Sequence, residues 1–310
     1  MSRFFLLSSF FVLVYFSSPA PALADAWPRH IKNADGTEVV IDKAPLKVLS
    51  TSVTVTGTLL AIDAPVVASA SATTNQFFSQ WQKVADARGV INLWPAGRID
   101  FEAVYEIEPD LIIVSLTGAD SVMAHVEMLR SIAPVLVVDY ASSDWQGLAK
   151  TLARAMGLEA QADAKISEFD QHVYAVKQSI SPPSGSVNIV SYNGPGIINP
   201  IGLASGAHGT LLTSLGFKVA PLHDSLLSEI PVAGDFIRTN YEQLTTLTAQ
   251  STFLLRRSVD DTAGFLNASI LKNLPSVQNA QVWGLGENSF RMDLYSANET
   301  IDIIHSAFAK

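Results

Sequence analysis

Cysteine is absent from all 310 residues of the sequence. Its absence excludes disulfide bonds, thiolate metal sites and a cysteine nucleophile. Histidine is scarce as well, and its six residues show neither the His-x-x-x-His nor the His-Glu-x-x-His spacing of zinc sites. A metal ion bound directly by protein side chains is therefore not expected.

Basic residues are in the minority. Lysine and arginine together number 20 against 29 aspartates and glutamates, which gives a formal net charge of −9. No stripe of basic residues stands out, so a nucleic-acid partner is not expected. Net charge describes the whole surface, however, and a local basic pocket is compatible with it.

Two common catalytic motifs are also missing. The segment Gly202-Leu203-Ala204-Ser205-Gly206 departs from the Gly-x-Ser-x-Gly nucleophile elbow because its first glycine and its serine are one residue too far apart. The phosphate-binding pattern Gly-x-x-x-x-Gly-Lys-Ser/Thr does not occur. Because no set of catalytic side chains stands out, the sequence favours binding over catalysis and predicts a protein that is not an enzyme.

The longest uncharged apolar run of the sequence lies at the N-terminus. Residues 1–24 are predicted to form a secretory signal, in which Arg3 supplies the positive charge and residues 4–16 the apolar core. Ala22-Leu23-Ala24 fits the small-residue site for cleavage after Ala24. The apolar core is shorter than the roughly 20 residues that a membrane-spanning helix needs. Since no cysteine is available to carry a lipid tether, we expect a soluble mature chain in a Gram-negative periplasm.

The tetrapeptide Gly-Thr-Leu-Leu occurs twice, at residues 57–60 and 209–212. Further along each half, an aromatic residue followed by glutamate opens a short amphipathic stretch, at Phe101-Glu102 and at Tyr241-Glu242. The same order of features in both halves indicates two lobes built alike. A ligand site is then expected in the cleft between them.

Short apolar runs alternate with amphipathic helical segments from residue 48 onward, which predicts an α/β fold with buried parallel strands. Helices are expected at 120–132, at 209–215 and, closing the chain, at 297–308. The predicted strands cover residues 66–68, 111–114, 135–138, 187–191, 253–255 and 282–285.

A helical stretch is predicted from residue 145 to about residue 180, with one break at Gly157. It divides the chain after the signal into an N-terminal α/β lobe (25–142), a connecting helix (143–181) and a C-terminal α/β lobe (182–310). A helical connector is stiffer than a linker rich in glycine and serine, so only small lobe motions are expected.

Several arginines stand at strand-to-helix junctions, where open α/β sheets bind ligands. Arg256 and Arg257 directly follow the predicted strand at 253–255, and Arg291 lies among bulky residues just after another strand. A solvated or salt-bridged side chain is the alternative for each. Their common placement favours a large, planar, anionic ligand, because guanidinium has a fixed charge and stacks on rings. The candidate ligand-binding residues are Arg291, Arg256, Arg257, Arg98, Trp94 and Tyr295.

Glu102 and Glu242 occupy matched positions in the two halves. One interpretation is that they are acids at helix N-termini, favourable to the helix dipole and otherwise without a role. The other is that each lobe presents one exposed carboxylate, and that the pair docks onto basic patches of a symmetric partner. The residues alone leave both open.

The chain resembles the periplasmic iron-siderophore and cobalamin binding-protein family. The resemblance rests on residues 48–68, on Phe101-Glu102 and on residues 108–113. Residues 290–297 and Trp27-Pro28-Arg29 are more similar to the ferric enterobactin-binding branch. The similarity covers nearly the whole chain after the signal.

This resemblance implies a class III periplasmic binding protein of helical-backbone type, with two α/β lobes joined by a single long helix. It implies binding of a ferric catecholate siderophore, enterobactin or an analogue, in which the siderophore holds the iron and no cofactor is present. A monomer is expected, because the two lobe tips must reach one permease pair. Delivery to an inner-membrane ABC permease dimer is implied, with Glu102 and Glu242 meeting permease arginines. Arg291 matches a ligand-contacting arginine, and Arg256 or Arg257 lies where related catecholate binders place another.

The chain also departs from the enterobactin branch. That branch has a ligand-contacting arginine in the segment corresponding to residues 74–76 and a tryptophan near residues 199–202, and this chain has neither. Arg98 and Trp94, from a neighbouring loop, are candidates to replace them. A haem or cobalamin carrier of the same family, a periplasmic siderophore esterase, and an exported adhesion or assembly module are the alternatives.

Overall fold

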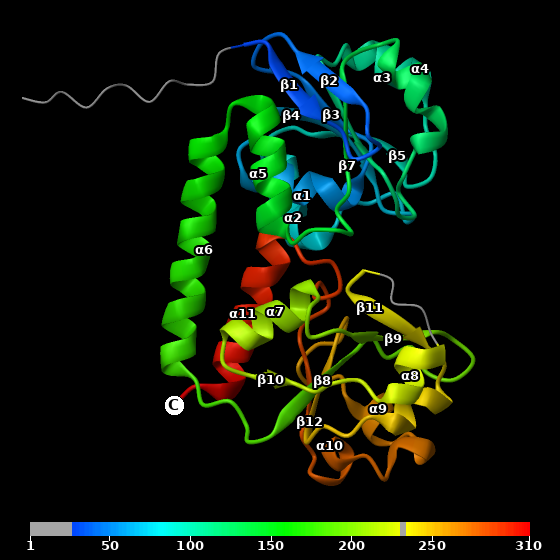
Figure 1. The fold of residues 1–310 in the computed structure, drawn as a ribbon, viewed down its shortest axis with the longest axis vertical. Coiled ribbons are helices and arrows are strands. Elements are labelled where there is room, and N and C mark those ends of the chain that lie inside the picture. The colour runs from blue at the N-terminus through cyan, green and yellow to red at the C-terminus, as the bar shows by residue number, and fades with distance from the viewer. Residues whose placement is uncertain (1–26, 230–233) are drawn as a thin grey trace, which may run out of the picture.

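The computed structural model describes residues 27–229 and 234–310. It consists of two α/β lobes that lie one above the other and are joined along one side by long helices (Figure 1). The predicted signal and its cleavage site lie outside the described residues. Within those residues, none of the helices is both long and apolar enough to cross a membrane.

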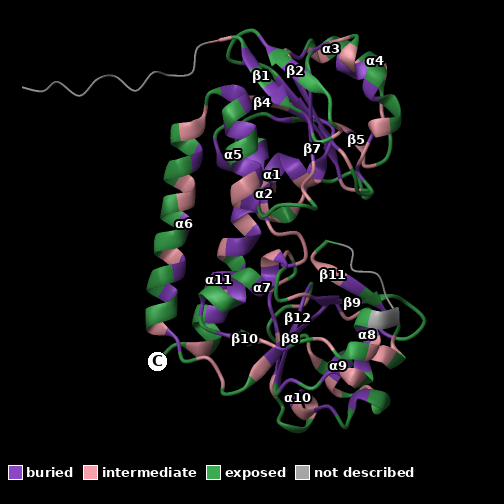
Figure 2. Ribbon diagram, viewed as in Figure 1, coloured by how far each residue is buried: buried purple, intermediate pink, exposed green. Residues whose placement is uncertain are grey.

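The first lobe is built on a five-stranded sheet whose neighbouring strands are all parallel. In sheet order the strands are β5 (Ile91–Pro95), β4 (Val66–Ser71), β3 (Val48–Ser50), β6 (Leu111–Ser115) and β7 (Val135–Val138). The helices are α1 (Val53–Ala61), α2 (Ser79–Ala87), α3 (Phe101–Ile107), the 3₁₀ helix η1 (Met123–His125) and α4 (Val126–Arg130). Strands β6 and β7 are buried along their whole length, as the continuous apolar runs predict (Figure 2).

An N-terminal hairpin, β1 (Arg29–Lys32) and β2 (Glu38–Ile41), is attached to this lobe. The Asn33 side chain fastens it to β7, since its amide donates to the Val135 carbonyl and its oxygen accepts from the Val137 N–H.

The second lobe has a mixed sheet in which β8, β10, β12 and β13 are parallel while β9 and β11 run antiparallel to their neighbours. Its strands are β11 (Phe236–Thr239), β9 (Asn199–Gly202), β8 (Ser186–Val190), β12 (Ser251–Leu254) and β13 (Val282–Gly284), with β10 (Lys218–Val219) beside β8. The helices are α7 (Ala207–Ser214), α8 (Asp224–Glu229), α9 (Ala263–Leu266), α10 (Pro275–Gln278) and the 3₁₀ segments η2 (Glu242–Thr246) and η3 (Ser269–Leu271).

The helical stretch predicted over 145–180 is present as two antiparallel helices, α5 (Trp145–Met156) and α6 (Glu159–Ser179). Gly157, with φ of 75°, ends α5 in the left-handed conformation that glycine adopts without strain. Helix α5 packs on the first lobe, and α6 runs past both lobes (Figure 1). Its 21 residues correspond to a length of about 32 Å.

Helix α11 (Leu294–Phe308) lies beside α6 and also reaches from the second lobe to the first (Figure 1). The apolar core therefore continues from one lobe to the other. A single cluster of buried side chains includes Leu59 of α1, Leu152 of α5, Phe169 of α6 and Leu211 of α7. This shared core makes the connection between the lobes stiff.

The two Gly-Thr-Leu-Leu copies lie in α1 and α7, and in each the glycine permits a close approach. A Cβ atom on Gly57 would lie 2.6 Å from Asp293 Oδ2 and 2.8 Å from Trp81 Cδ1. On Gly209 it would lie 2.3 Å from the Leu203 carbonyl oxygen. Gly57 therefore lets α1 touch the second-lobe residue Asp293, whereas Gly209 serves packing within the second lobe.

The helix predicted over 120–132 is wrong at its start, because regular helical structure begins only at Met123. Asp120 is held elsewhere. Its carboxylate accepts hydrogen bonds from Ser52 Oγ at 2.6 Å and from the Thr54 N–H at 3.1 Å, at the N-terminus of α1. These bonds fix Asp120 at the N-terminus of α1, so that it does not form the first turn of the predicted helix.

Candidate ligand-binding site

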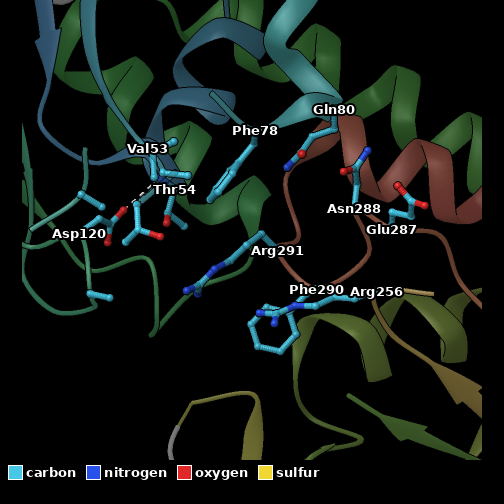
Figure 3. A pocket seen from close by; sticks show the side chains of 14 residues that line it. Val53, Thr54, Phe78, Gln80, Asp120, Arg256, Glu287, Asn288, Phe290 and Arg291 are labelled. Carbon is cyan, nitrogen blue, oxygen red and sulfur yellow. Dashed lines mark hydrogen bonds between the residues drawn. The ribbon is translucent and has the colours of Figure 1, made fainter. Parts of the chain in front are cut away.

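A cavity of about 360 Å³ lies between the two lobes. Figure 3 shows side chains of the first lobe, including Thr54, Phe78 and Gln80, facing Arg256, Phe290 and Arg291 of the second. The full lining is Val53, Thr54, Ala72, Thr73, Phe78, Gln80, Ala96, Ala119, Asp120, Arg256, Glu287, Asn288, Phe290 and Arg291. The ligand cleft expected from the two-lobe pattern is therefore present, and two of the predicted arginines line it.

Arg256 lies over an aromatic ring. Its guanidinium carbon is 3.8 Å from the centroid of the Phe290 ring. Its backbone has φ of 58°, a left-handed conformation that is strained in residues other than glycine. The Arg256 N–H donates to Ser289 Oγ at 3.1 Å, which helps to hold this conformation at the end of β12.

Arg291 extends from the second lobe toward the first (Figure 3). Its guanidinium carbon lies 5.4 Å from the Phe290 ring centroid and 6.0 Å from that of Tyr140 in the first lobe. Two arginines thus lie close to one aromatic ring, and the second arginine reaches across the cleft.

Neither Arg256 nor Arg291 forms an ion pair with any carboxylate of the described residues. Burial of its guanidinium, followed by the charges of Arg291 and Arg257, lowers the pKa of Arg256 from its ordinary value. Asp120 and Glu287 also line the cavity, but neither lies within ion-pair distance of the two guanidinium groups. An anion entering the cleft would supply the missing negative charge.

Arg257 is different from its neighbour. It donates to the Tyr192 carbonyl at 3.2 Å and lies 3.6 Å from the Asp261 carboxylate. It does not line the cavity. Of the two arginines that the sequence could not separate, the structure brings Arg256 to the cleft and gives Arg257 partners inside its own lobe.

Phe290 belongs to an aromatic stack within the second lobe. Its ring is stacked on Phe236, with centroids 5.2 Å apart and an interplanar angle of 15°. The buried His208 lies 5.4 Å from Phe236, and its Nε2 donates to the Ser289 carbonyl. Because burial lowers the pKa of His208, this ring adds no charge behind the arginines.

The first-lobe wall is fixed by the buried Asp120. Tyr140 donates its hydroxyl to Asp120 Oδ1 at 3.0 Å, in addition to the bonds from Ser52 and Thr54. Burial and the Asp120 charge raise the pKa of Tyr140 to about 12. The Asp120 carboxylate is thereby occupied by three donors, and the Tyr140 hydroxyl remains protonated at neutral pH.

The back of the cleft is where the lobes are hydrogen-bonded to each other. Gln80 Nε2 donates to Asp293 Oδ2 at 3.1 Å, and Ser79 Oγ donates to Asn288 Oδ1 at 2.6 Å. Asp293 also caps α11 by accepting from the Tyr295 and Ser296 N–H groups. Burial raises the pKa of Asp293 to about 6.

Three further predicted site residues do not line the cavity. Trp94 is only 4% exposed and packs in the first-lobe core, so the structure does not bring it to the ligand. Tyr295 packs against the shared core, on α11 behind Asp293. Arg98 is exposed and stands two residues beyond Ala96, which does line the cavity.

Of the two segments that depart from the enterobactin branch, the first adjoins the cavity lining and the second does not. Ala72 and Thr73 line the cavity, and a tight turn follows, closed by bonds from the Ala72 N–H to the Gln76 carbonyl and from the Asn75 N–H to the Ala72 carbonyl. Asn199 is completely buried and directs its amide into its own loop. Neither segment presents a cation or a large ring to the cavity.

Glu102 and Glu242 are both exposed, and both follow a polar cap and an aromatic residue. Asp100 caps α3 by accepting from the Glu102 and Ala103 N–H groups. In the second lobe the Asn240 side chain accepts from the Gln243 N–H at 2.9 Å. The two acids therefore occupy equivalent positions, although the second segment is a 3₁₀ helix.

Some cavity residues were not among the predicted ones. Phe290 stands next to Arg291 in the sequence, and that proximity is a signal that could have found it. Phe78, Gln80 and Asn288 carry no such signal, since they meet only when the lobes come together. The described residues contain no group of three or more histidine, aspartate or glutamate side chains placed to hold a metal ion.

Comparison with known proteins gives the family. A model of the periplasmic binding protein family matches residues 48–288. The chain belongs to this family. Its members are binding proteins, so the assignment agrees with a chain that is not an enzyme.

Two relatives are similar over nearly their full lengths. The ferric enterobactin-binding periplasmic protein FepB of Escherichia coli O6:H1 is 36% identical over 302 residues, which cover 94% of each chain. The crystal structure of holo-ViuP is 48% identical, has a TM-score of 0.89 and covers 92% of this chain and 97% of its own.

More distant structures share the fold alone. The FhuD protein from S. pseudintermedius, at 16% identity, superimposes with a TM-score of 0.72 over 91% of this chain and 98% of its own. The two lobes with a helical connection are thus the FhuD-like class III arrangement, as the resemblance implied.

Proposed function

We propose that this chain is the periplasmic substrate-binding protein of an ABC importer and that it binds a ferric catecholate siderophore. The observation that carries the proposal is the pair Arg256 and Arg291, which both lie near Phe290 in the interlobe cavity without an ion-pair partner among the described carboxylates. Guanidinium groups on an aromatic support suit a ligand that is both anionic and ring-bearing.

Ferric catecholate complexes have these properties. Each catecholate contributes two negative charges and an aromatic face, and the complex with iron remains an anion. Ferric hydroxamates lack that surplus of negative charge and would leave the two arginines without counter-ions, at a cost in desolvation. The similarity to FepB and to ViuP over more than nine-tenths of the chain supports the same ligand class.

In this proposal the siderophore alone coordinates the iron, and the protein meets the outside of the complex. Arg256 and Arg291 supply charge, and Phe290 and Phe78 supply apolar surface. The amides of Gln80 and Asn288 supply hydrogen bonds from opposite lobes. Arg98 lies close enough in sequence to Ala96 to be tested as a further contact at the rim.

The same proposal includes export and docking. After cleavage behind Ala24 the mature chain would act in the periplasm as a monomer. Glu102 and Glu242, one exposed acid on each lobe, would dock onto basic residues of the two permease subunits. Their equivalent cap–aromatic–glutamate settings support a symmetric partner.

A fluorescence titration tests the ligand class. Purified mature protein is titrated with ferric enterobactin, ferrichrome, haem and cobalamin, and its five tryptophans report binding. Saturable quenching by ferric enterobactin at submicromolar concentration is expected, with ferrichrome far weaker. Quenching by haem or cobalamin alone would identify another carrier of the family. Conversion of the ligand, followed by chromatography after incubation, would instead indicate an esterase.

A further inference from the structure

Two neighbouring isoleucines are exposed on the loop between β8 and β9. Ile197 is 59% exposed and Ile198 is 49% exposed. Neither lines the interlobe cavity. Exposed apolar side chains that adjoin one another are a feature of surfaces that contact other molecules.

The loop that carries them is well fixed. Asn199, at its end, accepts from the Asn193 and Gly194 N–H groups and donates to the Gly194 and Ile197 carbonyls. The Asn193 side chain donates to the Ile198 carbonyl at 2.7 Å. Both isoleucines are therefore held through their backbone, and binding through this loop costs little backbone entropy.

Sheet register places this loop next to Glu242. Strand β9 pairs with β11 so that Asn199, the residue after Ile198, stands opposite Thr239, three residues before Glu242. At the other end of the loop, the Tyr192 ring lies 6.3 Å from the Tyr241 ring. The loop that carries the isoleucines and the segment that carries the acid are thus neighbours at the β9–β11 end of the second sheet, which lies away from α6 (Figure 1).

The first lobe repeats this pairing of an acid with an apolar group. Tyr105 is 59% exposed and stands three residues after Glu102 on α3, which places both side chains on one face of the helix. Each predicted docking acid therefore has a large exposed neighbour with apolar surface.

We propose that each lobe docks through a composite contact, an acid and an apolar side chain together, and that residues 193–198 insert Ile197 and Ile198 into an apolar recess of one permease subunit. The recess would lie beside the basic side chain that meets Glu242. This inference rests on the proposed function, since it takes the membrane-embedded permease as the partner. The acid sets orientation and the rate of encounter, whereas the isoleucines add affinity that salt does not screen.

The test is a double variant, Ile197→Ser with Ile198→Ser. Serine keeps every backbone bond that orders the loop and removes only the apolar surface. Glu242→Gln is the charge variant, and Tyr174→Ser is the control, because Tyr174 is an exposed residue of α6 on the other side of the molecule. Binding of each protein, loaded with ferric enterobactin, to its importer in lipid nanodiscs is measured at low and high salt.

The double variant is expected to bind ferric enterobactin like the wild type and to bind the importer about tenfold more weakly at both salt concentrations. Glu242→Gln is expected to weaken importer binding mainly at low salt, and Tyr174→Ser to leave it unchanged.

If the double variant binds the importer as tightly as the wild type while Glu242→Gln binds it more weakly, the inference is overturned and docking through Glu242 stands. Importer binding that is absent, or indifferent to Glu242→Gln, would overturn the docking part of the proposed function and this inference with it. Weakened binding of ferric enterobactin by the double variant would make the loop part of the ligand site and would also overturn the inference.

Discussion

The guanidinium of Arg256 stacks on the ring of Phe290 at 3.8 Å, while the Arg256 backbone holds a left-handed conformation with φ of 58°. Strain of this kind persists only where surrounding contacts enforce it, and here the Ser289 hydroxyl and the Phe290 ring do so. The result is an arginine fixed in place before any ligand arrives. A preorganised charge binds more tightly, because less side-chain entropy is lost on association.

Arg256→Ala is expected to weaken binding of ferric enterobactin by at least about tenfold, because it removes a cavity cation that has no ion pair with a carboxylate of the described residues and is left to pair with the ligand. Arg257→Ala is the matched control. Since Arg257 is bound to the Tyr192 carbonyl and to Asp261, its loss should change affinity less than about threefold. Isothermal titration calorimetry measures both, and equal losses in the two variants would contradict the assignment.

Phe290→Leu keeps apolar bulk and removes the ring on which Arg256 lies. A cation–π contact of this geometry contributes roughly 0.5–2 kcal/mol, so affinity for ferric enterobactin should fall about three- to tenfold. Phe101→Leu, a half-buried aromatic residue on α3 outside the cavity, serves as the control. If both variants bind like the wild type in a fluorescence titration, the ring does not organise the site.

Gly57→Ala is expected to destabilise the protein by roughly 1–3 kcal/mol, because the added Cβ would lie 2.6 Å from Asp293 Oδ2 and 2.8 Å from the Trp81 ring. Gly264→Ala adds the same atom where the nearest neighbour, a Tyr192 ring carbon, is 3.7 Å away, an ordinary contact. Urea unfolding of the two variants provides the comparison. Equal stability would mean that α1 does not press on the second lobe at this point.

Asp293 should make folding stability depend on pH. Its pKa in the folded protein is about 6 against an ordinary value of 3.8, so the folded chain binds the proton more tightly than the unfolded chain does. Stability from this group is therefore highest at low pH and falls as the pH rises from about 4 through about 6.

Asp293→Asn removes that titration, and the amide oxygen can still cap α11. Relative to wild type, the variant should gain stability between pH 4 and pH 7 by an amount on the order of 2 kcal/mol. The exposed Asp163→Asn change on α6 should leave the pH profile as it is. If the stability of Asp293→Asn depends on pH in the same way as that of the wild type, the pKa of the buried carboxyl is not raised.

Much of the fold could be predicted because parallel strands buried on both faces are continuous apolar runs. The strands at 111–115 and 135–138 are of this kind. The sequence did not predict the antiparallel strands of the second sheet. Strand β9 contains Pro200, and β11 has only two apolar residues before Arg238, which is too short for an apolar run. The helix at 120–132 failed for a different reason, because tertiary hydrogen bonds to Asp120 override local helix propensity.

The site was predictable only where chain position alone indicates it. Arg256 follows a parallel strand, and carboxyl ends of parallel strands meet at the cleft edge, so its place could be inferred. Trp94 lies on β5 with its side chain turned inward, and the surrounding sequence does not reveal which face is buried. Gln80 and Asn288 come from segments about 200 residues apart, and only the packing of the lobes brings them to one cavity.

The central claim is that Arg256 and Arg291 together select an anionic ferric catecholate. It is tested most directly by calorimetric titration of ferric enterobactin into the wild type and into the Arg256→Ala, Arg291→Ala double variant, each at low and high salt. We predict single-site submicromolar binding by the wild type that weakens with salt, and affinity lower by about a hundredfold or more in the double variant. Wild-type protein that binds no ferric catecholate, or a double variant that binds as tightly as the wild type, would contradict the account.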